Sequence, residues 1–134
     1  MGFAQLLGNE YQEPLDLIHK AREGIKKSAF NHLQQQMGVS QKELAEMLHL
    51  TPRTLQRLRD DEKLPVAVSG QLLEIARVFK MAGEVLEDHE LARKWLRMPI
   101  PALNQEMPIR LLDTPAGIRW VTTVLGRMEY GVYS

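Results

Sequence analysis

Cysteine is absent from the sequence, so neither a disulfide nor a thiolate metal site can form in this chain. The absence fits a reducing cytoplasm, where we expect the protein to act. Excess charge of one sign is also absent, because 17 Lys and Arg residues balance 17 Asp and Glu residues. A protein that coats nucleic acid without sequence preference is strongly basic, so the composition excludes that class.

Long apolar runs are missing as well. No stretch approaches the roughly 20 apolar residues that a membrane-spanning helix needs, so we expect no membrane partner. The opening segment MGFAQLLGNEYQEP has neither a basic region nor a long apolar core, and it is therefore a poor signal peptide. What remains is a chain of 134 residues, 44% hydrophobic and 25% charged, which is typical of one globular domain or two small ones.

The patterns of catalytic sites are lacking too. The four histidines share no metal-ligand spacing, and the acidic residues around position 88 are more simply helix caps and a solvated face. There is no glycine-rich phosphate loop and no nucleophile elbow. The sequence therefore predicts a protein that is not an enzyme, with no catalytic residue, no metal ligand and no cofactor.

The most informative stretch that is present covers residues 40–58, SQKELAEMLHLTPRTLQRL. Ser40 with Glu43 has the spacing of a capping box at the start of a helix. Thr51 followed by Pro52 gives an N-cap and then a proline at the first helical position. The stretch therefore predicts two short helices joined by a tight turn.

The apolar residues of this stretch match a helix-turn-helix. Ala45 is a small residue where the two helices would cross, and Leu55 and Leu58 fall where the second helix needs apolar anchors. One feature departs from the usual pattern, since the turn holds His49 instead of glycine. Histidine tolerates a left-handed backbone less well than glycine, so we expect a slightly altered turn. The plainer interpretation is an αα-corner with a solvated basic face.

Positive charge is concentrated locally in this motif. Arg53, Arg57 and Arg59 follow one another on the expected second helix with no acidic residue between them, and the acidic run 60–62 comes directly afterwards. Arginine can bind guanine with two hydrogen bonds and glutamine can bind adenine likewise. Arg59 points further along the helix, toward a phosphate or solvent. Because the patch is small, we expect a homodimer in which two copies share one operator site.

The candidate DNA-binding residues fall into two sets. Those expected to face the major groove are Thr51, Pro52, Arg53, Gln56 and Arg57. Those expected near the phosphates are Gln41, Lys42 and Thr54.

The remaining sequence predicts an all-α fold. Residues 1–12 show no clear period, so we expect them to be frayed or dependent on a partner. Helical spacing follows over 25–37, 69–86, 88–96 and 114–128, with Gly38 capping the first of these helices. The charged linker 60–65 divides the chain into a helix-turn-helix domain, residues 1–65, and a small second domain, residues 66–134. Trp95 and Trp120 lie on helices of the second domain, where each can serve the core or an interface.

The second half contains a set of residues in a specific order: Ala92, Trp95, Leu96, Pro99, Leu103, Pro108, Leu111, Leu112, Thr114, Gly117, Val121, Leu125, Arg127 and the closing MEYGVYS. This set resembles the Xre/MbcA/ParS toxin-binding domain of antitoxins paired with RES-domain toxins. The first half also resembles these proteins, through REGI, QKELAEMLHLTPRTLQR and KLP, with the histidine in the turn as a departure.

The resemblance implies an antitoxin of a type II toxin–antitoxin system. Such a protein binds a RES-type toxin that consumes NAD, obstructs its active site with the C-terminal segment, and represses the operon of the pair through its helix-turn-helix. A helix ending at Gly131, followed by an aromatic segment, is compatible with entry into a cleft. The alternative is a stand-alone repressor whose second half dimerises or binds an effector. The candidate toxin-binding residues are Arg127, Met128, Glu129, Tyr130, Gly131, Val132, Tyr133 and Ser134.

Overall fold

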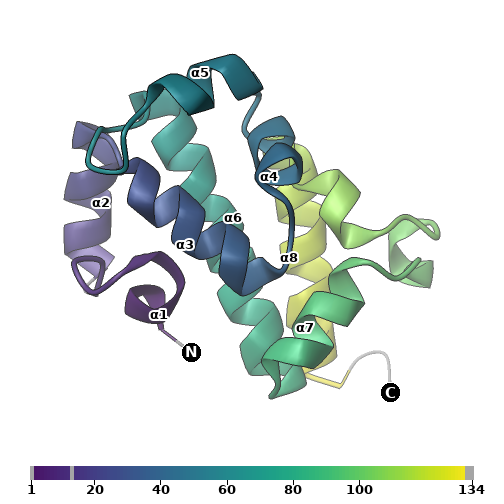
Figure 1. The fold of residues 1–134 in the computed structure, drawn as a ribbon. Coiled ribbons are helices and arrows are strands. Elements are labelled where there is room, and N and C mark those ends of the chain that lie inside the picture. The colour runs from purple at the N-terminus through teal and green to yellow at the C-terminus, as the bar shows by residue number, and fades with distance from the viewer. Residues whose placement is uncertain (1, 13, 132–134) are drawn as a thin grey trace. The chain divides into compact units, whose positions relative to one another are not determined.

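The computed structural model describes residues 2–12 and 14–131, and in this part of the chain the secondary structure is helical, with no strand (Figure 1). The all-α prediction is therefore confirmed. The elements are α1 (Phe3–Leu7), α2 (Pro14–Glu23), α3 (Lys27–Met37), α4 (Gln41–Met47), α5 (Pro52–Arg57), α6 (Val66–Leu86), α7 (His89–Leu96), the 3-10 helices η1 (Pro101–Leu103) and η2 (Pro108–Leu111), and α8 (Pro115–Glu129).

The chain forms two compact units that divide inside α6, between Arg77 and Val78. The sequence placed the domain boundary in the charged linker 60–65, which precedes this helix. The difference arises because α6 begins at Val66, before the predicted start at Ser69, and its first half packs as part of the first unit.

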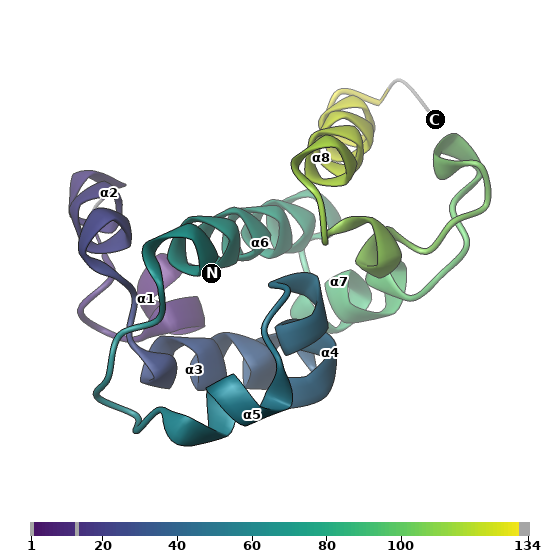
Figure 2. The same cartoon turned by 90° about the horizontal axis from the view of Figure 1, so that it is seen from above.

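The expectation that residues 1–12 are frayed or partner-dependent is wrong for residues 2–12, which the structure describes as an ordered segment. It contains α1, which packs against α3, and both views place these two helices side by side (Figures 1 and 2). Leu6 is 0% exposed and Leu7 and Tyr11 are each 2% exposed. A five-residue helix is too short to show a period, and its partner lies later in the same chain.

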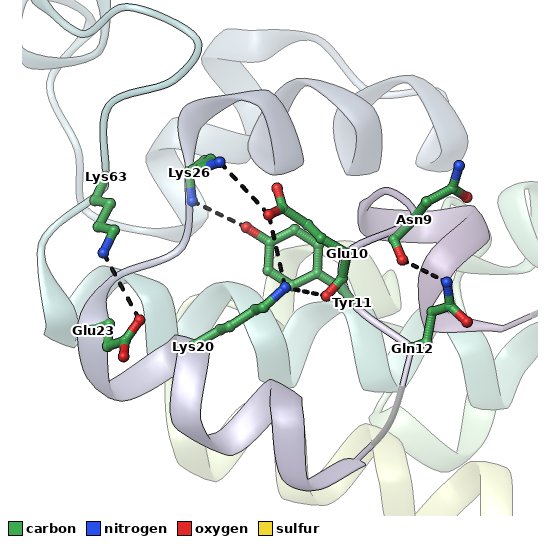
Figure 3. Close-up of polar contacts among 8 residues, drawn as sticks. All are labelled: Asn9, Glu10, Tyr11, Gln12, Lys20, Glu23, Lys26 and Lys63. Carbon is green, nitrogen blue, oxygen red and sulfur yellow. Dashed lines mark hydrogen bonds and ion pairs between the residues drawn. The ribbon is translucent and has the colours of Figure 1, made fainter.

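Polar contacts fix this segment to α2 and to the start of α3 (Figure 3). The Tyr11 hydroxyl accepts a hydrogen bond from the Lys26 backbone N–H at 3.3 Å. The Lys20 ammonium lies 4.7 Å from the centre of the Tyr11 ring and pairs with the Glu10 carboxylate at 3.7 Å. Burial of the Tyr11 ring therefore comes with a partner for its hydroxyl group.

The charged linker is also fixed to the first unit. The Leu64 N–H donates to the Ile25 carbonyl at 2.8 Å, and the Ile25 N–H donates to the Ser69 hydroxyl at 2.7 Å. Ser69 is fully buried, so its hydroxyl supplies the partner that the Ile25 N–H needs. Gly24, at φ +108°, lies so close to this linker that a Cβ atom there would be 2.7 Å from the Leu64 carbonyl oxygen.

In the second unit, α8 packs with η1 and η2, and α7 packs with η2. Thr114 caps α8 by accepting a hydrogen bond from the Gly117 N–H at 3.0 Å, as its pairing with Pro115 predicts. Asp88 caps α7 in the same way through the Glu90 N–H at 2.9 Å. These local caps set where both helices begin.

Candidate functional site

Two caps define the helix-turn-helix. The Ser40 hydroxyl accepts a hydrogen bond from the Glu43 N–H at 3.0 Å, and the Glu43 carboxylate accepts one from the Ser40 N–H at 3.1 Å. The Thr51 hydroxyl accepts from the Thr54 N–H at 3.1 Å, and Pro52 occupies the first position of α5. The predicted capping box and the predicted N-cap with proline are both confirmed.

The turn between the two helices places His49 in the left-handed region, at φ 57°. Leu48 and Leu50 on either side are buried, whereas His49 is exposed. The Leu50 N–H donates to the Ala45 carbonyl at 2.9 Å, which closes the turn over the buried Ala45. Glycine, the usual residue at this turn, adopts the left-handed conformation at lower cost. The turn therefore has a backbone that suits glycine, although histidine occupies the position.

The eight candidate DNA-binding residues are all exposed, on α4, on α5 and at the Thr51 cap. Arg53 and Arg57 lie on α5, which is anchored by the buried Leu55. Arg59 does not lie on this helix, because α5 ends at Arg57. The Arg59 guanidinium instead lies 3.4 Å from the Glu62 carboxylate and 3.7 Å from the Asp61 carboxylate. The basic patch on α5 therefore rests on two arginines.

A hollow of about 170 Å³ joins the two sets of candidate residues. Gln41 and Lys42, predicted near phosphates, lie on one wall, and Pro52 and Gln56, predicted to face bases, lie on the other. Its floor contains Ala45 and Leu55, the small residue and the apolar anchor of the motif. The structure therefore brings the starts of α4 and α5 to one concave surface.

Asn31 is a partner of Gln41 that sequence reasoning missed. The Gln41 side-chain amide donates a hydrogen bond to the side-chain Oδ1 of Asn31 at 3.2 Å, and the side-chain Nδ2 of Asn31 donates to the Asp60 carboxylate at 3.2 Å. These contacts connect α4 with α3 and with the linker. They join residues far apart in the sequence, so no local pattern points to them.

The candidate toxin-binding segment continues from the end of α8. Met128 is half-buried, and Tyr130, the residue that caps the helix, is 82% exposed. Gly131 follows at φ 73°, so the predicted end of the helix at this glycine is confirmed. Val132, Tyr133 and Ser134 lie outside the described residues.

The two tryptophans of the second unit differ in exposure. Trp95 on α7 is 7% exposed and belongs to the core, whereas Trp120 on α8 is 38% exposed. Leu96 beside Trp95 is 1% exposed and belongs to the same core. The sequence left open whether each tryptophan serves the core or an interface. The structure places Trp95 in the core and leaves the Trp120 ring partly accessible.

Among residues 2–12 and 14–131, no group of three or more His, Cys, Asp or Glu side chains is placed to hold a metal ion. None of the helices described there combines the length and apolar character that crossing a membrane demands.

The fold and the motif define the class: an all-helical helix-turn-helix protein with a second helical unit after the motif. Two family models match the chain. The antitoxin Xre-like helix-turn-helix domain matches residues 16–77, and the antitoxin Xre/MbcA/ParS C-terminal toxin-binding domain matches residues 81–131. Between them they cover most of the sequence, in the order that the structure shows. The chain belongs to the Xre/MbcA/ParS antitoxin family.

Curated relatives carry antitoxin names. The "Prs ADP-ribosylating antitoxin" of Sphingobium sp. (strain YBL2) is 26% identical over 131 residues, which cover 90% of this chain and 82% of that protein. "Antitoxin Xre" of Yersinia enterocolitica is 33% identical over 95 residues, covering 67% of this chain and 64% of that protein. "Antitoxin Xre" of Photorhabdus laumondii is 31% identical over 67 residues, covering 49% of this chain and 45% of that protein.

Proposed function

We propose that this chain is the antitoxin of a type II toxin–antitoxin pair. It neutralises a RES-type, NAD-consuming toxin by placing residues 127–134 in the active site, and it represses its own operon through the helix-turn-helix. The observation that carries the proposal is the presence in one chain of an exposed basic α5 and a C-terminal toxin-binding domain. This role requires no catalysis and no cofactor from the chain itself.

The proposed class of toxin is supported by the name of one relative and by the side chains at the end of α8. The Sphingobium relative is named for ADP-ribosylation, a reaction in which NAD supplies the transferred group. The exposed Tyr130 and the arginine one turn before it, Arg127, offer an aromatic ring and a cation at the point where the helix ends. Both groups are suited to a cleft that binds a dinucleotide, and their entry would exclude the substrate.

The toxin-blocking role is tested by deleting residues 129–134. Because the buried face of α8 ends at Leu125 and the half-buried Met128, the shortened protein should keep its melting temperature and its binding to operator DNA. Cells that express the toxin with the shortened chain should stop growing and lose NAD, whereas cells with the full chain should do neither. Full protection by the shortened protein would contradict the mechanism and favour the stand-alone repressor.

The repressor role is tested in the promoter of the pair. A homodimer should place its two α5 helices on half-sites about 34 Å apart. Arg53→Ala or Arg57→Ala should each cost about 1–3 kcal/mol of binding and relax base preference at one position. Lys42→Ala should weaken binding evenly across sequences and flatten the salt dependence. If gel shifts show that both arginine variants bind the operator as tightly as the original protein, the prediction that α5 lies in the major groove is wrong.

A further inference from the structure

The hollow between α4 and α5 combines an apolar floor with a polar rim. Ala45 is 1% exposed and Leu55 is 4% exposed, and the exposed Pro52 adds a further apolar side chain to the lining. The polar lining residues, all exposed, are Gln41, Lys42 and Gln56. Among the described residues no carboxylate lines the hollow. A fitting occupant therefore carries an apolar group, groups that form hydrogen bonds, and negative charge.

The two glutamines of the rim differ in their hydrogen bonds. The Gln41 side-chain amide already donates to the side-chain Oδ1 of Asn31 at 3.2 Å. In the part of the chain that the structure describes, the exposed Gln56 carboxamide has no hydrogen-bond partner. A carboxamide offers one acceptor and a donor side by side, and this pair matches the N6 donor and N7 acceptor of adenine in the major groove. Gln56 is therefore the group of this rim that suits an adenine.

The base paired with adenine explains the apolar floor. Thymine carries a C5-methyl group, the apolar group that an A·T pair presents in the major groove. This methyl group lies on the side of the pyrimidine nearest its own sugar–phosphate backbone, away from the paired adenine. The hollow has the same order, because Lys42, predicted near a phosphate, lies on one wall, Gln56 lies on the other, and the floor lies between them.

We infer that the hollow receives the C5-methyl group of one thymine in each half-site of the operator. Lys42 then contacts the backbone of the thymine strand, and Gln56 binds the paired adenine. The inference rests on the proposed function, because it names a base pair that the proposed operator contains. It adds an A·T pair at a fixed position to any guanine that Arg53 or Arg57 binds.

Other occupants fit the hollow less well. A phosphate group alone would pair with Lys42, but its charged oxygens would lose water against the apolar floor of Ala45 and Leu55. A small effector molecule needs more room, since the hollow measures about 170 Å³ and small-molecule sites occupy roughly 300–1,000 Å³. The edge of a base that carries a methyl group satisfies both the floor and the rim.

The test removes the methyl group from the DNA and leaves the protein unaltered. The full chain is titrated with the promoter fragment of the toxin–antitoxin pair, and then with fragments in which uracil replaces one thymine at a time. At one position of each half-site, uracil should weaken binding about fourfold, the effect expected for the burial of one methyl group. If no uracil substitution weakens binding, the inference is overturned and the proposed function stands. If the thymine fragment itself does not bind, the proposed repressor role fails.

Two protein variants connect the methyl effect to the hollow. Gln56→Ala, at an exposed position, should keep the melting temperature and reduce discrimination between T·A and C·G about tenfold at the uracil-sensitive base pair. Arg57→Ala is the matched control, since Arg57 is exposed on the same helix but does not line the hollow. It should weaken binding and leave both the uracil effect and this discrimination unchanged. Loss of discrimination by Gln56→Ala at a different base pair, or loss of the uracil effect in Arg57→Ala, would overturn the inference.

Discussion

At Gly117, the backbone of α8 approaches the end of η2 so closely that no side chain fits. A Cβ atom there would lie 1.8 Å from the Leu111 carbonyl oxygen, and backbone cannot move aside as a flexible side chain can. Gly117→Ala should therefore destabilise the fold by about 1–3 kcal/mol or more, measured by chemical denaturation. The matched control is Gly70→Ala within α6, where nothing lies within 4 Å of the added atom. The unfolding free energy of that variant should rise by roughly 0.5–1 kcal/mol. If both substitutions changed the unfolding free energy by the same amount, the close packing at Gly117 would be contradicted.

Tyr11 links stability to pH. Burial raises the pKa of its hydroxyl group above the ordinary value of 10.0, the Glu10 carboxylate adds to the effect, and the hydrogen bond from Lys26 opposes it. The folded state therefore keeps this proton to higher pH than the unfolded state does, so the contribution to stability is complete below about pH 10 and is lost as pH rises through the raised pKa. As pH rises from about 10 through the raised pKa of Tyr11, the unfolding free energy of the original protein should fall more steeply than that of Tyr11→Phe. Parallel denaturation curves for the two proteins across this range would exclude the linkage.

At the scale of single helices, the sequence predicts starts and ends well because the signals are local. The capping box at Ser40 and the two threonine–proline pairs act on N–H groups three residues away, and Gly38 closes α3 at φ 68° in the same local manner. Arg59 shows the limit of this reasoning. Nothing in its immediate neighbours forbids another helical turn, yet the Arg59 N–H donates to the Glu62 carboxylate at 2.9 Å, in the turn that follows α5.

The helix α1 shows the contrasting case, in which the signal is not local. Leu6 and Leu7 are buried because α3 lies against them, and a sequence period cannot reveal a contact with a helix some twenty residues away. The same holds for Ser69, whose hydroxyl meets Ile25, and for Asn31 beside Gln41. The candidate DNA-binding residues could thus be named from the motif, whereas the groups that hold Gln41 could not.

The docking of α1 predicts a measurable effect. Leu6 is fully buried, so Leu6→Ala should lower the unfolding free energy by about 2–5 kcal/mol through lost burial and a cavity. Leu15→Ala is the matched control, since this leucine on α2 is 62% exposed and its loss should cost less than about 0.5 kcal/mol. Thermal unfolding of both variants provides the comparison. A small effect of Leu6→Ala would mean that α1 contributes little to the first unit.

At the scale of the whole chain, the two proposed activities depend on different units. Variants of Arg53 alter the first unit and removal of residues 129–134 alters the second. We therefore expect Arg53→Ala to lose repression of a reporter gene while cells stay protected from the toxin, and the deletion to show the reverse. Assaying both readouts for both proteins checks this, and loss of both functions by either change would show that the activities are coupled.

The place where the units divide has a consequence for how the sequence can change length. A loop absorbs an added residue, but the division between Arg77 and Val78 falls within α6, a continuous helix of 21 residues. One inserted residue there would turn every later position of the helix by about 100°, carrying the buried Val78, Phe79 and Ala82 out of phase with Leu72 and Ile75. Insertions and deletions in related sequences should therefore be rare within residues 66–86. Recombination that exchanges the two halves should succeed only where it preserves the helical phase of α6.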